Sequence, residues 1–325
     1  MKILSSQDVR HLLPMTEAID VVAATMVNVS NGTETLPLRN AISVGGDNKM
    51  GIMPGAISDP SCFGIKLVSL FPGNPALGLS SHSGAIVLFE SETGSAIAMM
   101  DAGLLTAIRT AAASGAATKT LSRENASSLA IVGYGEQAEF HLDAICAVRD
   151  IQRLHVAGRS AHKAGDFAAR AAIKYPALEI TSGADVKTAV QNADIICTVT
   201  ASPTPILSGQ WLRTGTHLNV VGSSIPSMRE IDDEAVLRSS VWVDYLKSAE
   251  AQAGEIVHMI NAGTLSKTDI KGEIGQVISG EIPGRTDNAQ ITLYRSLGIA
   301  AQDLAAAHHV LKKADAAGMG QDVDF

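Results

Sequence analysis

Three small residues at the junction of an apolar strand and an amphipathic helix constrain the fold of this chain most strongly. Gly133, Gly135 and Ala138 form the pattern Gly-x-Gly-x-x-Ala, after the apolar run SSLAIV and before the helical run EQAEFHLDAICAV. The first glycine permits a tight turn, the second lets the backbone approach a pyrophosphate, and the third small residue lets the helix pack on the strand. The pattern therefore predicts a dinucleotide-binding strand–helix–strand unit. The alternative is a structural turn that binds no ligand.

Strand-type and helix-type segments alternate from residue 128 onward. Strands are expected within the runs SSLAIVG, RLHVAGR, LEITSG, DIICTVT, HLNVVGS and VWVDY, several of them followed by helical patterns. This alternation predicts an α/β fold, a Rossmann-type doubly wound parallel sheet with helices on both faces. Before it, residues 6–31 predict two helices, residues 36–98 a β-rich antiparallel or mixed segment, and residues 102–121 an Ala-rich helix. A last helix is expected to begin near Gln302.

The end of the second strand of this unit bears on the choice of cofactor. An enzyme that binds NAD usually places Asp or Glu there, on the ribose 2′-hydroxyl. Here the strand ends His155-Val156-Ala157-Gly158-Arg159-Ser160, with no carboxylate. The Arg159 guanidinium can pair with a 2′-phosphate, so we expect NADP(H) to be preferred, with NAD(H) as the alternative cofactor. The competing interpretation is that Arg159 is a solvated loop charge.

Composition excludes several other classes of protein. A length of 325 residues suggests about two domains, and an apolar fraction of 46% excludes a disordered chain. The net charge of -8 argues against a nucleic-acid partner. The first residues lack the apolar core of a signal peptide, no membrane-spanning run is visible, and the three cysteines form no disulfide or metal pattern. We therefore expect a cytoplasmic protein, and a mean hydropathy of +0.17 suggests a buried subunit interface.

Several longer motifs point to one family. They occupy residues 64–94, 104–121, 130–145, 219–232 and 291–307, and include a Lys before FPGNP, the run LTAIRTAAAS and the glycine pattern followed by Gln-Ala. In these motifs the chain resembles the ornithine cyclodeaminase/mu-crystallin family over nearly its whole length. The resemblance implies a Rossmann domain at residues 122–301 that binds NAD(P). It also implies a second α+β domain, residues 1–121 with 302–325, that binds the substrate and forms a homodimer, with the active site between the domains.

The reactions of the family pass through an imine or amine next to a carboxylate. They include cyclodeamination of ornithine or lysine, formation of alanine, and reduction of cyclic ketimines. The resemblance assigns the carboxylate-binding cations to Arg39, Lys66 and Arg109. From the residues alone, Lys66 interrupts a β-type run, and Arg109 is the only charge between Asp101 and Lys119. A cation in such apolar surroundings needs an anionic partner, and the alternative for Arg109 is a structural ion pair with Asp101 or another subunit.

One position separates the reactions of the family. The cyclodeaminases carry an Asp in the loop after the fifth Rossmann strand, and this chain has Ser224 there. Without that carboxylate, ring closure loses its best candidate base, whereas a protonated cyclic imine mainly needs to be positioned against the nicotinamide. We therefore expect reduction of Δ1-pyrroline-2-carboxylate to L-proline, and by the same site Δ1-piperideine-2-carboxylate to L-pipecolate. The alternatives are an ornithine cyclodeaminase, an alanine-type dehydrogenase, or a non-catalytic crystallin-like binding protein.

The remaining candidate residues follow from these arguments. His82 is a candidate for exchanging the imine proton, because a histidine titrates near neutral pH, and a loop histidine without a catalytic role is the alternative. His308 and His309 lack a supporting carboxylate cluster, so we expect no metal site. The candidate catalytic residues are Lys66 and His82, and the candidate substrate-binding residues are Arg39, Lys66, Arg109 and Ser224. The candidate cofactor-binding residues are Gly133, Tyr134, Gly135, Glu136, Gln137, Ala138, Arg159, Ser160, Thr200 and Ser223.

Overall fold

The computed structural model describes residues 1–324 and contains two compact units. The first unit is Met1–Thr110 together with the segment from Gly298 onward, and the second unit is Ala111–Leu297. Helix α3 (Ala102–Leu121) begins in the first unit and ends in the second. The sequence placed the domain boundaries at 121/122 and 301/302, and these boundaries stay a prediction.

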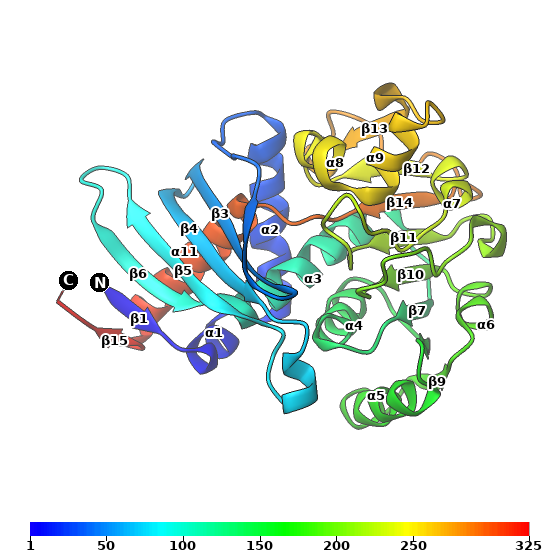
Figure 1. Ribbon diagram of the computed structural model, residues 1–325, viewed down its shortest axis with the longest axis horizontal. Helices are drawn as coiled ribbons and strands as arrows, with labels where there is room; N and C mark the ends of the chain where they lie inside the picture. The colour runs from blue at the N-terminus through cyan, green and yellow to red at the C-terminus, as the bar shows by residue number, and fades with distance from the viewer. Residues whose placement is uncertain (325) are drawn as a thin grey trace. The chain divides into compact units, whose positions relative to one another are not determined.

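The second unit is built on an eight-stranded sheet in which every neighbouring pair is parallel. Its strands are β7 (Ser128–Val132), β8 (Arg153–Ala157), β9 (Glu179–Gly183), β10 (Ile195–Thr198), β11 (His217–Val220), β12 (Ser240–Val243), β13 (Ile270–Glu273) and β14 (Thr292–Arg295). The strand order is β13-β12-β14-β11-β10-β7-β8-β9 (Figure 1). From β7 the chain adds β8 and β9 on one side, and β10 and the later strands lie on the other side, so the order of the strands reverses between β7 and β10. Ligands of such sheets bind at this reversal, outside the carboxyl ends of the strands. The predicted α/β fold is confirmed.

Helices connect the strands of this sheet. They are α4 (Glu136–Val148), α5 (Ala161–Lys174), α6 (Val186–Val190), α7 (Asp233–Leu237), α8 (Leu246–Gln252), α9 (Gly254–Asn261) and α10 (Ile274–Ile278), with short 3-10 turns at Gly209–Trp211 and Lys267–Asp269. Buried Ala, Val, Ile and Leu side chains form two separate core clusters in this unit. Parallel sheets are covered on both faces, and here the strands β7, β10 and β11 are completely buried.

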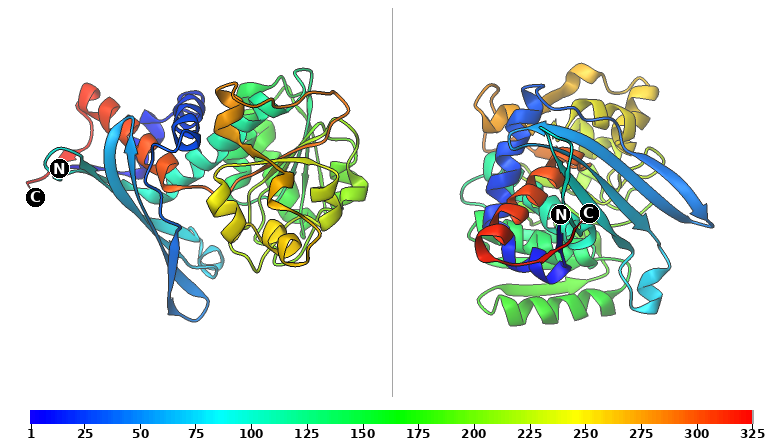
Figure 2. Two further views of the ribbon diagram at one scale, coloured as in Figure 1. Left: turned by 90° about the horizontal axis from the view of Figure 1, so that it is seen from above. Right: turned by 90° about the vertical axis from the view of Figure 1, so that its left-hand side faces the viewer.

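The first unit contains a seven-stranded mixed sheet in the order β15-β1-β6-β5-β4-β3-β2. Its strands are β1 (Lys2–Leu4), β2 (Asn40–Gly45), β3 (Asn48–Ser58), β4 (Ser61–Leu70), β5 (His82–Glu90), β6 (Ala96–Asp101) and β15 (Gln321–Asp322). The pairing of β1 with β15 brings the two ends of the described chain side by side (Figure 2). The sequence predicted a β-rich segment at residues 36–98, which contains β2 to β5 and the start of β6, whereas β1 and β15 are too short to give a pattern.

The helices of the first unit lie together on one side of this sheet (Figures 1 and 2). Besides the start of α3 they are α1 (Ser6–Leu12), α2 (Met15–Ser30) and α11 (Ala300–Ala317), with a 3-10 turn at Asn74–Leu77. Helix α11 packs across β3, β4 and β5, and α2 packs against α11. One row of paired side chains, Met53, Lys66, Ile86 and Met100, is buried on one face of β3–β6. A lysine in this row is exceptional, because its neighbours are apolar.

No single helix within residues 1–324 is long and apolar enough to cross a membrane. Helices α1 and α2 reach that length and apolarity only when they are taken together, and they are bent by 84° relative to each other.

Candidate functional site

The loop after β7 has the geometry that a bound pyrophosphate requires. Gly133 has φ +121°, and a Cβ atom there would lie only 2.7 Å from the carbonyl oxygen of Val199. Gly135 is the N-cap of α4, and a Cβ atom there would meet nothing within 4 Å. Since no side chain caps α4, the N–H groups at its start can bind an anion. Within residues 1–324, Oε1 of Gln137 is buried without a hydrogen-bond partner, so the loop fits a nicotinamide dinucleotide that would complete it.

Arg159 follows β8 and is exposed. Within the described residues 1–324 its guanidinium forms no hydrogen bond or ion pair, so it is available to a ligand. The ring of Tyr134 lies over Gly158, where a Cβ atom would come within 2.5 Å of that ring. Ser160 is the N-cap of α5 and accepts a hydrogen bond from the backbone N–H of Lys163 at 3.3 Å. An aromatic side chain at position 134 therefore requires the glycine before Arg159.

The loops after β10 and β11 are held together by one buried carboxylate, Glu230. It accepts hydrogen bonds from Oγ1 of Thr198 at 2.8 Å, from the backbone N–H of Thr200 at 2.6 Å, from Oγ1 of Thr200 at 2.8 Å and from the backbone N–H of Gly222 at 2.7 Å. Burial raises the pKa of Glu230, although these donors oppose the shift. Ser223 lies in the second of these loops and is buried. Two candidate cofactor residues, Thr200 and Ser223, are thus fixed at the carboxyl edge of the sheet.

In the first unit, cations from three segments meet the start of α11. Nζ of Lys66 lies 2.9 Å from Oδ1 and 2.8 Å from Oδ2 of Asp303, and Nε of Arg109 donates to Oδ1 at 2.7 Å. Nη1 of Arg109 donates to Oε1 of Gln302 at 2.9 Å. Arg39 donates to the carbonyl oxygen of Gly298. Two of the three predicted carboxylate-binding cations, Lys66 and Arg109, therefore pair with one buried carboxylate, and Arg39 bonds to the backbone just before the same helix.

The charges of this cluster act strongly on one another. Burial and the adjacent Arg109 lower the pKa of Lys66 to about 7, Arg39 adds to this shift, and Asp303 opposes it. Burial alone would raise the pKa of Asp303, but Arg109 and Lys66 hold it below its usual value. Lys66 and Arg109 thus share a single carboxylate while Arg39 acts on Lys66, and the cluster keeps an excess of positive charge. Such a site favours an anionic ligand.

Arg109 is oriented by its surroundings in the first unit. Its guanidinium lies against Gly298, which has φ +75°, and a Cβ atom at that position would overlap Nη1 and lie 3.0 Å from Cζ. The Nη2 group has no hydrogen-bond partner among the described residues. Asp101, which the sequence offered as an ion-pair partner, instead accepts a hydrogen bond from the backbone N–H of Leu104 at 2.8 Å. Arg109 therefore uses two of its guanidinium nitrogens, Nε and Nη1, within the protein and keeps Nη2 for a ligand.

His82 and Ser224 belong to different units. His82 begins β5 and keeps contact with solvent, yet partial desolvation of its ring and then the charge of Lys66 lower its pKa. Its Nδ1 lies 2.9 Å from Oγ of Ser81. Ser224 is half-buried in the loop after β11, and it has no hydrogen-bond partner among the described residues. His82 thus shares the electrostatic surroundings of Lys66.

Comparison with known proteins identifies the family of this chain. Residues 1–318 match the ornithine cyclodeaminase/mu-crystallin family. The chain belongs to this family. A family member from Bacillus cereus, a Δ1-pyrroline-2-carboxylate reductase, is 34% identical over 329 residues, which cover 100% of both chains. The resemblance that the sequence motifs indicated is therefore confirmed.

Two solved structures of family members have the same fold. The Δ1-pyrroline-2-carboxylate reductase of Thermococcus litoralis in complex with NADH and L-proline has a TM-score of 0.96 and 34% identity, covering 99% of this chain and 100% of that one. An archaeal alanine dehydrogenase dimer with bound NAD has a TM-score of 0.93 and 30% identity, covering 100% of this chain and 99% of that one. Binding of a nicotinamide cofactor is thus supported for this member of the family.

Sequence reasoning missed two acidic residues of this family member. Asp303 stands in the first turn of a helix, a position where acidic residues are common because they stabilise the helix dipole. Glu230 stands four residues after Pro226 in a polar loop. Neither has a local signal of burial, because each is buried by partners from distant segments. Asp303 is 237 positions from Lys66 and 194 positions from Arg109.

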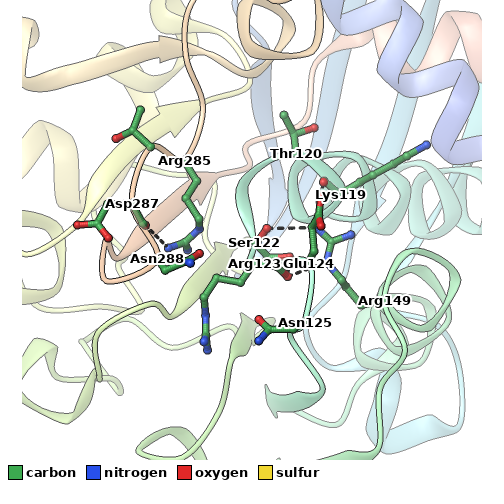
Figure 3. A pocket seen from close by; sticks show the side chains of 11 residues that line it. Lys119, Thr120, Ser122, Arg123, Glu124, Asn125, Arg149, Arg285, Asp287 and Asn288 are labelled. Carbon is green, nitrogen blue, oxygen red and sulfur yellow. Dashed lines mark hydrogen bonds between the residues drawn. The ribbon is translucent and has the colours of Figure 1, made fainter.

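The second unit also contains a cavity with a volume of about 540 Å³, which is shown in Figure 3. It is lined by Lys119, Thr120, Ser122, Arg123, Glu124, Asn125, Arg149, Arg285, Thr286, Asp287 and Asn288. Nη2 of Arg149 donates to the carbonyl oxygens of Thr118 and Lys119 at 3.0 Å each, at the end of α3. Nε of Arg285 donates to the carbonyl oxygen of Leu121 at 2.8 Å. These arginines bind carbonyl groups at the end of α3, at the amino edge of the sheet and away from the predicted cofactor residues, so we assign no ligand.

Proposed function

We propose that the protein is a nicotinamide-dependent reductase of cyclic α-imino acids. The first candidate substrate is Δ1-pyrroline-2-carboxylate, which would give L-proline, and the second is Δ1-piperideine-2-carboxylate, which would give L-pipecolate. The observation that carries the proposal is the pairing of Lys66 and Arg109 with Asp303, with the charge of Arg39 acting on Lys66. The excess positive charge suits the carboxylate that these substrates share. The named activities of the relatives point to the same reaction class.

The reaction adds a hydride and a proton across the C=N bond. The cofactor supplies the hydride, and the glycine loop, Arg159, Thr200 and Ser223 are the residues proposed to hold it. The chain's own task is to hold the carboxylate, so that the imine carbon has one orientation. Orientation of this kind supplies most of the acceleration for an electrophile that is already activated by protonation.

The proton for the imine nitrogen has two candidate sources. A Lys66 ammonium with a pKa near 7 carries a proton at slightly acidic pH and releases it readily at neutral pH. His82 has a lowered pKa and is mostly neutral at pH 7, so it is better suited to relay a proton than to store one. We assign the donation to Lys66 and a relay role to His82.

Cyclodeamination of ornithine is the competing function within the family. It requires a base for the substrate amine, and this chain has Ser224 at the position of the cyclodeaminase carboxylate. Asp303 is already engaged by two cations, so it does not replace that base. The test compares NADPH- and NADH-dependent reduction of pyrroline-, piperideine- and open-chain imino acids with ammonia release from ornithine. Ornithine turnover at a rate that matches imine reduction would contradict the proposal, and a preference for open-chain substrates would favour an alanine-type dehydrogenase.

We also propose that NADP(H) is preferred to NAD(H). The support is the exposed, unpaired Arg159 at the end of β8 and the absence of a carboxylate in its segment. Arg159→Ala should weaken NADPH binding about 10- to 100-fold, because a charge-assisted hydrogen bond is lost. NADH binding should change little. Cofactor fluorescence titrations measure both dissociation constants, and Arg153→Ala, an exposed arginine at the other end of the same strand, is the control. Equal weakening for the two cofactors would exclude a contact with the 2′-phosphate.

We further propose that the protein is a homodimer. The sequence-based expectation rested on the Ala-rich helix, but most of α3 is already buried within the chain. The better support is the second face of the sheet in the first unit. There Phe63, Ile65, Leu67, Val87 and Met99 are only half-buried, and the ring of Phe63 stacks on Phe89 with centroids 5.1 Å apart. A contiguous apolar face of this kind is typical of a subunit interface.

Light scattering at micromolar concentration should give twice the mass of the chain. Val87→Glu places a charge in the centre of the apolar face, between Ile65 and Met99, and should shift the protein to a monomer. Ile173→Glu is the matched control, because Ile173 is a highly exposed apolar residue on α5 in the other unit. A wild-type monomer, or an unchanged dimer in the Val87 variant, would contradict this interface.

A further inference from the structure

We infer that Asp303 is a positioning residue that orients Lys66 and Arg109 for the substrate carboxylate and keeps Lys66 protonated. This inference rests on the proposed function, since it concerns the carboxylate of the imino acid. It assigns the role to the start of α11, a segment that is distant in sequence from all the predicted site residues of the first unit.

Asp303 occupies some of the hydrogen-bond donors of Lys66 and Arg109 and leaves the others for a ligand. Its Oδ1 accepts from Nε of Arg109 and from Nζ of Lys66, and its Oδ2 lies 2.8 Å from the same Nζ. Arg109 therefore presents Nη2 rather than Nε to a ligand, with Nη1 held by Gln302. Both cations are fixed before the substrate binds. Such preorganisation lowers the entropic cost of binding the substrate.

The charge of Asp303 also controls the protonation of Lys66. The charged and titratable groups that face Lys66 are Arg39 from the segment before β2, His82 from β5, Arg109 from α3 and Asp303 from α11. Asp303 is the only anion among these four groups. Arg109 and Arg39 disfavour the ammonium, as burial does, whereas His82 is mostly neutral at pH 7. Without the carboxylate charge, Lys66 would therefore lose its proton at a lower pH.

The side chain of Asp303 is completely buried, so its effect on stability must be separated from its effect on the site. A purely structural ion pair would change the melting temperature but not the pH profile. Leu304→Ala provides the matched control. Leu304 is the next residue of α11, is also buried, and lies against the backbone of β4, where a Cβ atom at Gly64 would approach its Cδ2 to 2.9 Å.

The experiment measures kcat/KM for pyrroline-2-carboxylate from pH 5.5 to 9 in the wild type, Asp303→Asn and Leu304→Ala. The profile of kcat/KM reports the free enzyme. We expect Asp303→Asn to lower kcat/KM about 10- to 100-fold at pH 7, mainly through KM, and to move the alkaline limb to lower pH. The dissociation constant of NADPH should stay unchanged. Leu304→Ala should lower the melting temperature and leave the alkaline limb in place. An unchanged KM and limb in Asp303→Asn would overturn the inference.

Two unpaired buried cations could prevent Asp303→Asn from folding, so a second pair of variants is included. Lys66→Met removes one of these charges, and Asp303→Asn is then introduced into that background. Because Lys66 is the proposed proton donor, this pair is compared by binding of the product L-proline rather than by turnover. The added change should still weaken L-proline binding, through misorientation of Arg109, and an unchanged dissociation constant in this background would overturn the inference. Absence of imine reduction by the wild type would instead refute the proposed function, so the two failures are distinguishable.

Discussion

Arg109→Ala should lower kcat/KM for pyrroline-2-carboxylate about 30- to 4,000-fold. This range corresponds to about 2–5 kcal/mol, the cost of losing a charge-assisted contact in a desolvated site. The guanidinium is 4% exposed and keeps Nη2 for a ligand while Nε and Nη1 are bonded to α11. The fall should be present at saturating cofactor. Steady-state kinetics with varied imino acid measures it directly.

Arg109→Lys should not restore full activity. An ammonium has no planar fork, so it cannot bond to Asp303, Gln302 and the substrate at the same time in the observed arrangement. The affinity for the cofactor should stay nearly constant in both variants, because the predicted cofactor residues belong to the second unit and Arg109 to the first. Activity in Arg109→Ala equal to that of the wild type would exclude the carboxylate-binding role.

Gly298→Ala is expected to have the second largest effect, a loss of about 100-fold in kcat/KM. An alanine Cβ atom would overlap Nη1 of Arg109, so the guanidinium would have to move. A displacement of about 1 Å at a positioning group costs activity on this scale. Most of the loss should appear as a higher KM for the imino acid, and thermal unfolding measures the accompanying loss of stability.

Gly318→Ala is the matched control for backbone strain. Gly318 has φ +63°, close to the φ +75° of Gly298, and it is the C-cap of α11, the helix that Gly298 precedes. A Cβ atom there meets nothing within 4 Å. Both variants should lose stability by about 1–2 kcal/mol, the cost of placing an L-residue in the left-handed region. Only Gly298→Ala should lose activity, and comparable kinetics in the two variants would show that Arg109 is not displaced.

Local patterns explain why most of the second unit could be predicted. The glycine motif, the apolar runs of β7, β8, β10 and β11, and the amphipathic helix α4 are each specified by neighbouring residues, and all lie where the sequence indicated. Strand β14 was missed, although it is completely buried between β11 and β12. Its segment, ITLYRS, lacks strong turn signals, and its place in the sheet depends on packing between distant segments rather than on chain order.

The sequence by itself determined the α/β fold, the glycine loop after β7 and the family, because periodicity, glycine spacing and family motifs are properties of short stretches of chain. It also indicated Lys66 and Arg109, since cations within apolar runs require an anion, and the family resemblance added Arg39. Only the tertiary structure decided which anion pairs with Lys66 and Arg109. Asp303 resembles an ordinary solvated residue in the first turn of a helix, and it becomes a buried carboxylate because α11 packs across β3, β4 and β5. Contacts between residues about 200 positions apart, as between Arg109 and Asp303, are set by packing of whole elements and leave no local pattern.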